Sequence, residues 1–155
     1  PGRFETGTQS FEGLAGIIAA VGYLAQWGDP QATLRERLEQ SFVQFNAHEQ
    51  AITERFLSRL ASLDGVQLYG RAVADSQLRT PTFALTFDQL APELVARALG
   101  EQNICVWNGH FYALGLVKQL GLEESGGVVR IGFMHYNTLE EVDRLFDALE
   151  RLLQA

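Results

Sequence analysis

An arginine inside an apolar segment is the first residue of this 155-residue sequence that could do chemistry. Arg130 lies between Val129 and Ile131, in a run that is typical of a short and largely apolar strand. A guanidinium in such a strand needs an anion or a bidentate carboxylate partner, because otherwise nothing offsets its desolvation. We therefore expect Arg130 either to bind an anionic ligand or to pair with a carboxylate of the protein.

A glycine and a threonine near the start of the sequence form a second candidate site. Gly7 and Thr8 precede a helix that is predicted to begin near Ser10. Main-chain N–H groups, a hydroxyl and the positive end of a helix dipole together suit a phosphate. The pair is a candidate phosphate site, with a plain helix cap as the alternative.

The third candidate is a long connection between two predicted strands, at residues 106–127. Connections of about twenty residues inside a compact domain are usually functional. This one contains His110 and Tyr112. The Tyr112 phenol can donate a hydrogen bond or relay a proton, and His110 can orient it. The alternative for both is that they pack the loop; no metal site is predicted.

The elements around these residues follow from periodicity and capping signals. Thr138 and Glu141 form a capping box before the last helix, and Asp29 with Pro30 predicts the start of the second. Helices are expected at 11–27, 30–63, 92–99 and 139–153, with a short one near 112–120, and strands at 66–69, 82–87, 104–107 and 128–133. This order predicts an α/β fold, more narrowly an α+β sandwich with helices on one face of a mostly antiparallel sheet.

Burial and exposure are predicted for three further features. The first helix carries apolar residues around much of its surface, so we expect it to be buried on more than one side. His48 is expected to be solvated, without a functional role. Cys105, the one cysteine, is expected to be a buried thiol in the third strand.

Composition limits the classes of partner. A net charge of -7 argues against nucleic acid or an anionic membrane surface. A single cysteine excludes an intramolecular disulfide framework and favours the reducing cytoplasm. The most apolar run, residues 14–27, is short and glycine-rich for a membrane span, and no export signal is recognised.

Two segments of the sequence resemble a known family. "VVRIGFMHYNTLEEVDRLFDALERL" and "RFETGT" are similar to segments of the cysteine desulfurase-like branch of the class V aminotransferases, pyridoxal-phosphate enzymes of fold type I. The resemblance implies that Arg130 binds the α-carboxylate of an amino-acid substrate. It also implies that Gly7 and Thr8 reach the cofactor phosphate of the other subunit in a homodimer. Residues 1–28 would then be a cofactor-proximal segment with an interdomain or dimer helix, and residues 29–155 the small C-terminal domain.

The loop departs from the pattern of that family. The family has Gly-His-His-Cys-Ala, with the cysteine as the nucleophile that takes sulfur from the substrate. Here Gly109 and His110 match, but Tyr112 stands at the nucleophile position, and Trp107 replaces an arginine before the loop. A phenol cannot form a persulfide, which argues against desulfuration by the usual route. His110 and Tyr112 stay candidate catalytic residues, and Trp107 joins Arg130 as a substrate-binding candidate.

The Schiff-base lysine of the family has no counterpart in this sequence. Lys118 is the one lysine, and it lies in the loop rather than upstream of "RFETGT". We therefore expect the chain to be the C-terminal part of a longer enzyme, whose N-terminal domain would complete the pyridoxal-phosphate site, and to be inactive alone. The alternative is a free-standing interaction or regulatory domain that uses its apolar first helix as a partner surface. Transamination, epimerisation, β-elimination and decarboxylation stay open as reactions of the parent.

Overall fold

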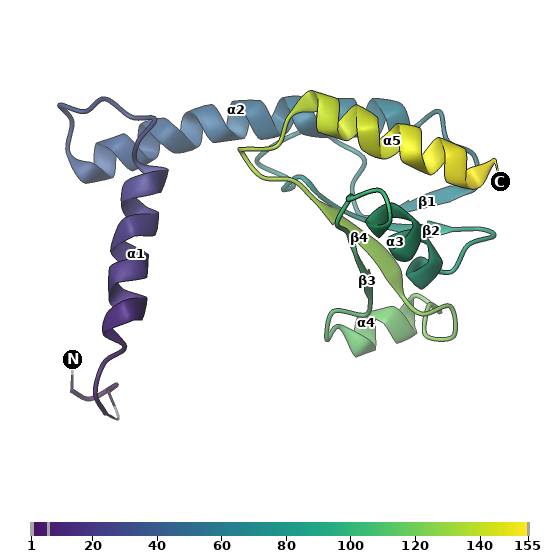
Figure 1. The fold of residues 1–155 in the computed structure, drawn as a ribbon, viewed down its shortest axis with the longest axis horizontal. Helices are drawn as coiled ribbons and strands as arrows, with labels where there is room; N and C mark the ends of the chain where they lie inside the picture. The colour runs from purple at the N-terminus through teal and green to yellow at the C-terminus, as the bar shows by residue number, and fades with distance from the viewer. Residues whose placement is uncertain (1, 6, 155) are drawn as a thin grey trace. The chain divides into compact units, whose positions relative to one another are not determined.

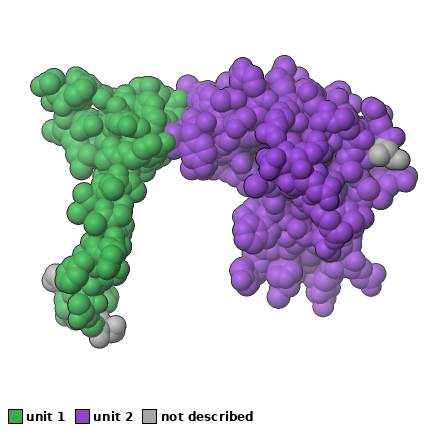
Figure 2. Space-filling model, viewed as in Figure 1, with its two compact units in different colours: residues 1–45 green, residues 46–155 purple. Residues whose placement is uncertain are grey.

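The structure is a computed structural model that describes residues 2–5 and 7–154. Its elements are α1 (Phe11–Leu24), α2 (Leu34–Leu60), β1 (Val66–Tyr69), β2 (Thr82–Phe87), α3 (Pro92–Gly100), β3 (Trp107–Gly109), α4 (Leu114–Gln119), β4 (Val128–Gly132) and α5 (Leu139–Leu153) (Figure 1). The chain divides within α2 into two compact units, Pro1–Phe45 and Asn46–Ala155 (Figure 2).

Three residues lie outside the described part of the chain, namely Pro1, Thr6 and Ala155. The outer ends of the predicted segments 1–28 and 29–155 fall on two of them. The boundary expected between residues 28 and 29 stays a prediction.

In the first unit residues 25–33 form the turn that joins α1 to α2. Gly28 lies against the main chain of Arg37, where a Cβ atom would come within 2.5 Å of the Arg37 Cα atom. A side chain at position 28 would therefore force the two segments apart. Beside the turn, Trp27 packs edge-on against Phe45, with 4.9 Å between ring centroids.

The second helix begins later than predicted. The expected start at Asp29 and Pro30 is wrong, because the Asp29 carboxylate accepts a hydrogen bond from the Gln31 N–H and forms part of the turn. The first helical turn is closed instead by Thr33 and Glu36. The Glu36 carboxylate accepts from the Thr33 hydroxyl at 2.7 Å and from its N–H at 2.8 Å, and these bonds lower the pKa of Glu36.

The first helix begins as predicted, but it is not buried. The Ser10 hydroxyl accepts the Gly13 N–H at 3.2 Å and caps α1. No residue of α1 is buried, and Phe11, Ile17 and Ile18 are exposed. The expected burial on more than one side is therefore wrong for this chain. Near the C-terminal end of α1, the Tyr23 ring packs edge-on against Trp27 of the connection to α2. Figure 1 shows the two helices joined at this end of α1. Within the described residues no helix is both long and apolar enough to cross a membrane.

In the second unit four strands form an antiparallel sheet in the order β1-β2-β4-β3. Helices α3 and α5 and the later part of α2 pack on one face, so the predicted α+β sandwich is confirmed. The third strand is displaced from its expected position at 104–107 to Trp107–Gly109. The reason is that the Ile104 N–H donates to the Leu99 carbonyl, a bond that ties residue 104 to the C-terminal end of α3.

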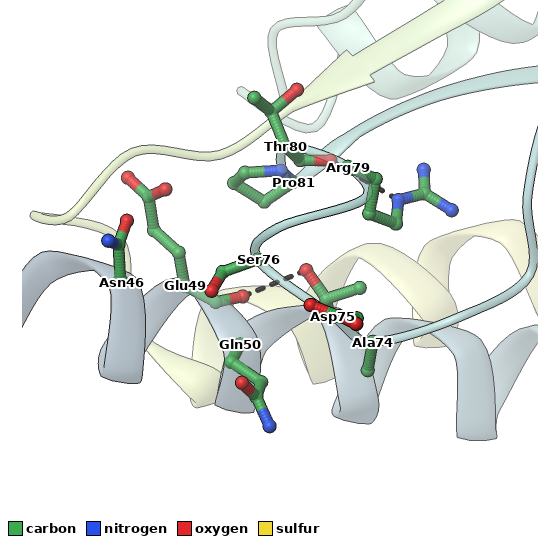
Figure 3. A pocket seen from close by; sticks show the side chains of 10 residues that line it. Asn46, Glu49, Gln50, Ala74, Asp75, Ser76, Arg79, Thr80 and Pro81 are labelled. Carbon is green, nitrogen blue, oxygen red and sulfur yellow. Dashed lines mark hydrogen bonds between the residues drawn. The ribbon is translucent and has the colours of Figure 1, made fainter.

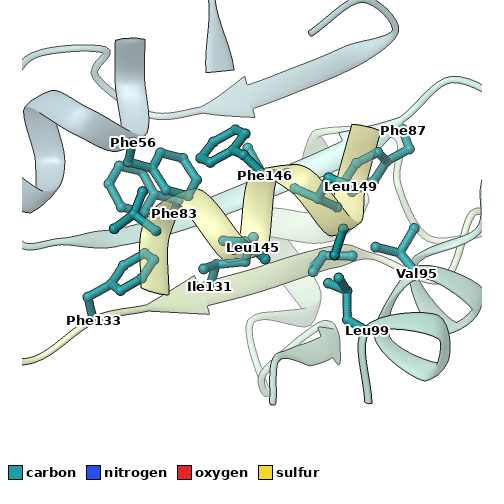
Figure 4. Close-up of a cluster of buried hydrophobic side chains, with 14 of the residues drawn as sticks. Phe56, Phe83, Phe87, Val95, Leu99, Ile131, Phe133, Leu145, Phe146 and Leu149 are labelled. Carbon is teal, nitrogen blue, oxygen red and sulfur yellow. The ribbon is translucent and has the colours of Figure 1, made fainter. Parts of the chain in front are cut away.

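A group of aromatic rings lies at the centre of the core (Figure 4). Phe56 of α2 stacks on Phe83 of β2, with 3.6 Å between centroids, and meets Phe146 of α5 edge-on at 4.9 Å. All three rings are fully buried. One side chain of α2 therefore joins the sheet to the last helix.

Above this core, charged side chains join α2 to α5. Arg59, whose side chain is 20% exposed, bonds to Asp147 at 2.8 Å and to Asp143 and Glu150 at 3.0 Å. The hydrogen bonds that Arg59 donates to Asp147 and Glu150 raise the pKa of Arg59. Arg55 forms a bidentate pair with Asp143 and lowers the pKa of that carboxyl. These ion pairs link the exposed sides of the two helices.

We expect the Phe56→Ala substitution to lower the free energy of unfolding by about 3–5 kcal/mol, because it removes a buried ring and leaves a cavity. Urea denaturation followed by near-UV circular dichroism measures this loss. Phe42→Ala is the matched control in the same helix, because the Phe42 ring is 48% exposed. Equal losses for the two substitutions would contradict the central position of Phe56.

Candidate functional site

Arg130 lies on the face of the sheet that the helices leave open. Along β4 the buried residues Val129 and Ile131 flank an exposed Arg130. The expectation of a desolvated guanidinium is therefore wrong, because side chains alternate along a strand and Arg130 points away from the core. The pairing register puts Trp107 of β3 and Ala84 of β2 directly beside it on the same face.

Among the described residues the Arg130 guanidinium has no carboxylate partner. Across residues 2–5 and 7–154 it makes neither a hydrogen bond nor an ion pair. The alternative of a pair with a protein carboxylate thus has no support in the described chain. Its close contact is instead the ring of Phe111, whose centroid lies 4.4 Å from the guanidinium carbon.

The loop after β3 is held in an unusual backbone conformation. Phe111 and Tyr112 have φ angles of 51° and 61°, and Gly109 has 123°. For residues with a side chain the left-handed region costs about 1 kcal/mol or more each, and such strain gathers at functional sites. Two bonds hold the turn: the Tyr112 N–H donates to His110 Nδ1 at 3.1 Å, and the Ala113 N–H donates to the His110 carbonyl at 2.7 Å.

The His110 ring has a defined role in that turn. Because Nδ1 accepts the Tyr112 N–H, a neutral ring carries its proton on Nε2. The rings of His110 and Tyr112 lie 6.3 Å apart, roughly edge to face. His110 thus contacts Tyr112 through the main chain.

These residues surround one open hollow of about 440 Å³, which we call the Arg130 hollow. Four of the six predicted site residues meet there. Trp107 is 67% exposed and Tyr112 is 98% exposed. The residues that line the Arg130 hollow are Trp107, Asn108, Gly109, His110, Phe111, Tyr112 and Arg130.

The other two predicted site residues, Gly7 and Thr8, belong to the first unit. Both are exposed, and Thr6 beside them lies outside the described residues. The residue of this segment that caps α1 is Ser10, so neither Gly7 nor Thr8 is the N-cap. The hydroxyl of Thr8 has no hydrogen-bond partner in the part of the chain that the structure describes.

Cys105 and Lys118 both lie outside the Arg130 hollow. The prediction of a buried thiol is wrong: because the strand begins at Trp107, Cys105 lies on the exposed connection before it. The thiol borders a separate hollow of about 230 Å³ beside Arg144. Lys118 is exposed on α4. Among the described residues no cluster of histidine, cysteine and carboxylate side chains is arranged to hold a metal.

Sequence reasoning missed the role of His48. It is half-buried rather than solvated, and its Nε2 lies 2.7 Å from the carbonyl oxygen of Asn137. Asn137 in turn accepts the Met134 N–H and donates to Glu141, so these bonds fix the turn between β4 and α5. The contact joins residues 89 positions apart, and no local pattern could have indicated it.

A small cavity of about 50 Å³ lies between α2 and residues 74–81 (Figure 3). Glu49 lines this cavity. Burial raises the pKa of its carboxyl, and the charges of His135 and His48 act in the opposite direction and lower it by less. Burial also lowers the pKa of Arg79, which donates to the Thr82 carbonyl and stacks over Phe83. A space of this size suits about one or two water molecules rather than a substrate. The Arg130 hollow is therefore the better candidate site.

Comparison with known proteins identifies relatives of the chain. The family model described as Aminotransferase class-V matches residues 1–145. A probable cysteine desulfurase of Methanothermobacter thermautotrophicus is 31% identical over 98% of this chain and 34% of its own length. The aminotransferase-like protein FGM3 of Gibberella zeae is 31% identical over 97% of this chain and 35% of its own.

A solved structure has the same fold. The apo cysteine desulfurase of Thermococcus onnurineus superposes with a TM-score of 0.79 at 28% identity, over 99% of this chain and 34% of that one. The chain thus spans about a third of the length of the relatives that it matches.

The strained turn yields a stability prediction. We expect Tyr112→Gly to unfold with a free energy about 0.5–1 kcal/mol higher than Tyr112→Ala, because glycine adopts positive φ angles without a Cβ clash. The alanine variant is the matched control, since both substitutions remove the same exposed ring. Urea denaturation of the two variants measures the difference. A less stable glycine variant would contradict the left-handed conformation at position 112.

Proposed function

The chain belongs to the class-V aminotransferase family, and we propose that it is the C-terminal part of a longer enzyme that acts on an amino acid. Class V aminotransferases and cysteine desulfurases are in general pyridoxal-phosphate enzymes, and the chain has the fold of their small C-terminal domain. The proposed parent is a cytoplasmic homodimer in which an N-terminal domain of the same chain completes the site. The net charge of -7 supports small-molecule chemistry rather than nucleic-acid or membrane binding.

The single observation that carries the proposal is the Arg130 guanidinium in its hollow, which has no partner within residues 2–5 and 7–154. A guanidinium presents its N–H groups in one plane and binds a carboxylate through two parallel hydrogen bonds. Among the described residues no acidic side chain competes for it. We assign to Arg130 the α-carboxylate of the substrate, and to Trp107, its neighbour across the strand pair, a wall of the substrate site.

The segment at Gly7 and Thr8 fits a phosphate group. The Thr8 hydroxyl is unused within the described residues, and apart from its chain neighbours Gly7 has no described heavy atom within 4 Å of the place where its Cβ would be. A ligand can therefore approach this main chain closely. We propose that the two residues contact the cofactor phosphate of the other subunit. Pyridoxal phosphate, when bound, supplies an electron sink for negative charge at the substrate Cα atom.

His110 and Tyr112 are the proposed catalytic residues of this part of the enzyme. His110 holds the turn through Nδ1 and keeps Nε2 as the ring atom that can carry a proton. The Tyr112 phenol, in the Arg130 hollow, can donate a hydrogen bond to the substrate or relay a proton. Sulfur transfer through a persulfide is not proposed, because the one thiol, Cys105, borders a different hollow.

The lysine that carries the cofactor is assigned to the N-terminal domain of the parent. Lys118 is exposed on α4 and does not line the Arg130 hollow. We therefore propose that this chain alone is inactive. The exposed residues of α1 favour one other candidate function, a non-catalytic interaction domain that uses this helix as its partner surface. In the main proposal the same helix packs on the larger domain or on the partner subunit.

In the parent enzyme, Arg130→Met is expected to raise the KM for the amino-acid substrate about tenfold to a hundredfold, because it removes charge-assisted hydrogen bonds to the carboxylate. Steady-state kinetics measures this change. Arg97→Met is the matched control, since Arg97 is exposed on α3 and bonds to Glu93. An unchanged KM for the Arg130 variant would remove the proposed role.

The cofactor role of Thr8 has its own test in the parent. Thr8→Ala should weaken pyridoxal-phosphate binding several-fold, because it removes one hydroxyl from the phosphate. Absorbance titration of the apo form with pyridoxal phosphate gives the Kd. Ser10→Ala tests the nearby helix cap alone and should leave the Kd unchanged. Equal cofactor affinities for the Thr8 variant and the unmodified parent would contradict the assignment.

A further inference from the structure

Aromatic side chains surround Arg130 and leave much of their surface in water. Trp107 lies opposite Arg130 in the strand register and is 67% exposed. Tyr112 is 98% exposed, and both side chains line the same hollow. Exposed rings gathered around a concave site are typical of ligand recognition, because a ligand ring that packs on them removes apolar surface from water.

Phe111 controls how the guanidinium can be approached. The Arg130 guanidinium carbon lies over its ring, 4.4 Å from the ring centroid. The N–H donors of a stacked guanidinium stay in its plane, so a carboxylate can still bind along the edge. The carboxylate of a ligand would therefore be fixed beside the rings of the hollow rather than on top of Phe111.

The turn that carries two of these rings is held in place before any ligand arrives. The bond from the Tyr112 N–H to His110 Nδ1 fixes the turn that carries Phe111 and Tyr112. At the base of the loop, Gly127 lies so close to the Gly109 carbonyl that a Cβ atom would be 2.3 Å from its oxygen. A site that is already ordered loses less conformational entropy on binding.

From this arrangement we infer that the Arg130 hollow selects an amino acid with an aromatic side chain. This inference rests on the proposed binding of the substrate carboxylate by Arg130. The ring of the ligand packs on Trp107 and Tyr112 while its carboxylate bonds to the guanidinium. A volume of about 440 Å³ has room for such a side chain, whereas the small thiol side chain of cysteine would leave most of the aromatic surface uncovered.

Trp107 itself provides the measurement. The sequence has two tryptophans, so a ¹⁵N-labelled chain gives two indole N–H signals in an NMR spectrum. Trp27 lies in the first unit beside Phe45 and serves as the internal control, assigned with Trp27→Phe. The chain is titrated with L-phenylalanine, L-alanine, L-cysteine and L-phenylalaninamide.

We expect L-phenylalanine to shift the Trp107 signal with a Kd about three- to tenfold lower than that of alanine or cysteine, from its added ring packing. L-phenylalaninamide, which lacks the carboxylate, should bind about tenfold more weakly than phenylalanine. The Trp27 signal should not move with any of the four ligands. No shift of Trp107 with any of them would overturn the inference.

Two variants separate the contributions of charge and ring. Arg130→Met should weaken the binding of phenylalanine and of alanine by the same factor. Arg97→Met should leave the binding of both unchanged. In the Tyr112→Ala variant, the Kd of phenylalanine should come close to the Kd of alanine measured on the same variant. Tyr112 is almost fully exposed, so this variant keeps the fold.

The results distinguish this inference from the proposed function. If phenylalanine, alanine and cysteine bind equally and all depend on Arg130, aromatic selection is overturned but the carboxylate site stands. If phenylalanine binds equally well to the Arg130→Met variant, both the carboxylate role and the inference built on it fail.

Discussion

The fold and the candidate site both depend on the alternation of side chains along β4. This strand lies between β2 and β3, and it sends Val129 and Ile131 into the core while Arg130 faces the open side. A shift of the register by one residue would bury the guanidinium and expose two large apolar groups. The packing of Phe56 and Phe83 on the helical face therefore also determines where the cation lies on the opposite face.

Two arginines show how differently one residue type can be used in this acidic protein. Arg59 is surrounded by Asp143, Asp147 and Glu150 and joins α2 to α5. Arg130 has no such partner among the described residues and stacks on Phe111. The charge of Arg59 is neutralised by side chains of the fold, whereas the charge of Arg130 stays available to a ligand.

Features set by neighbouring residues were predictable from the sequence. The capping box of Thr138 and Glu141 is present, and β2 has its expected bounds with Phe83, Leu85 and Phe87 on the buried face. Side chains alternate along β4, so Arg130, between two buried neighbours, could have been predicted to face away from the core. The apolar character of the run suggested a buried arginine instead.

Features that leave no sign in the residue types of the segment were not predictable. The position of β3 depends on the Ile104 N–H, which bonds back to α3, and the exposure of Cys105 follows from it. The burial of His48 depends on Asn137, far along the chain. In the site, the residue types in the loop were visible, but the left-handed conformation of Phe111 and Tyr112 was not, because neither residue type favours it.

The close approach of Gly109 and Gly127 has a consequence for how such a site can diversify. The two glycines join the ends of the β3–β4 loop at the edge of the sheet, and both have positive φ angles. The two ends of the loop, residues 110–126, therefore lie side by side where they join the strands. Insertions, deletions or exchanges within the loop can change which side chains stand over Arg130 without disturbing the strand register. Relatives with the same sheet can therefore evolve different ligand preferences through this one segment, provided that both glycines are kept.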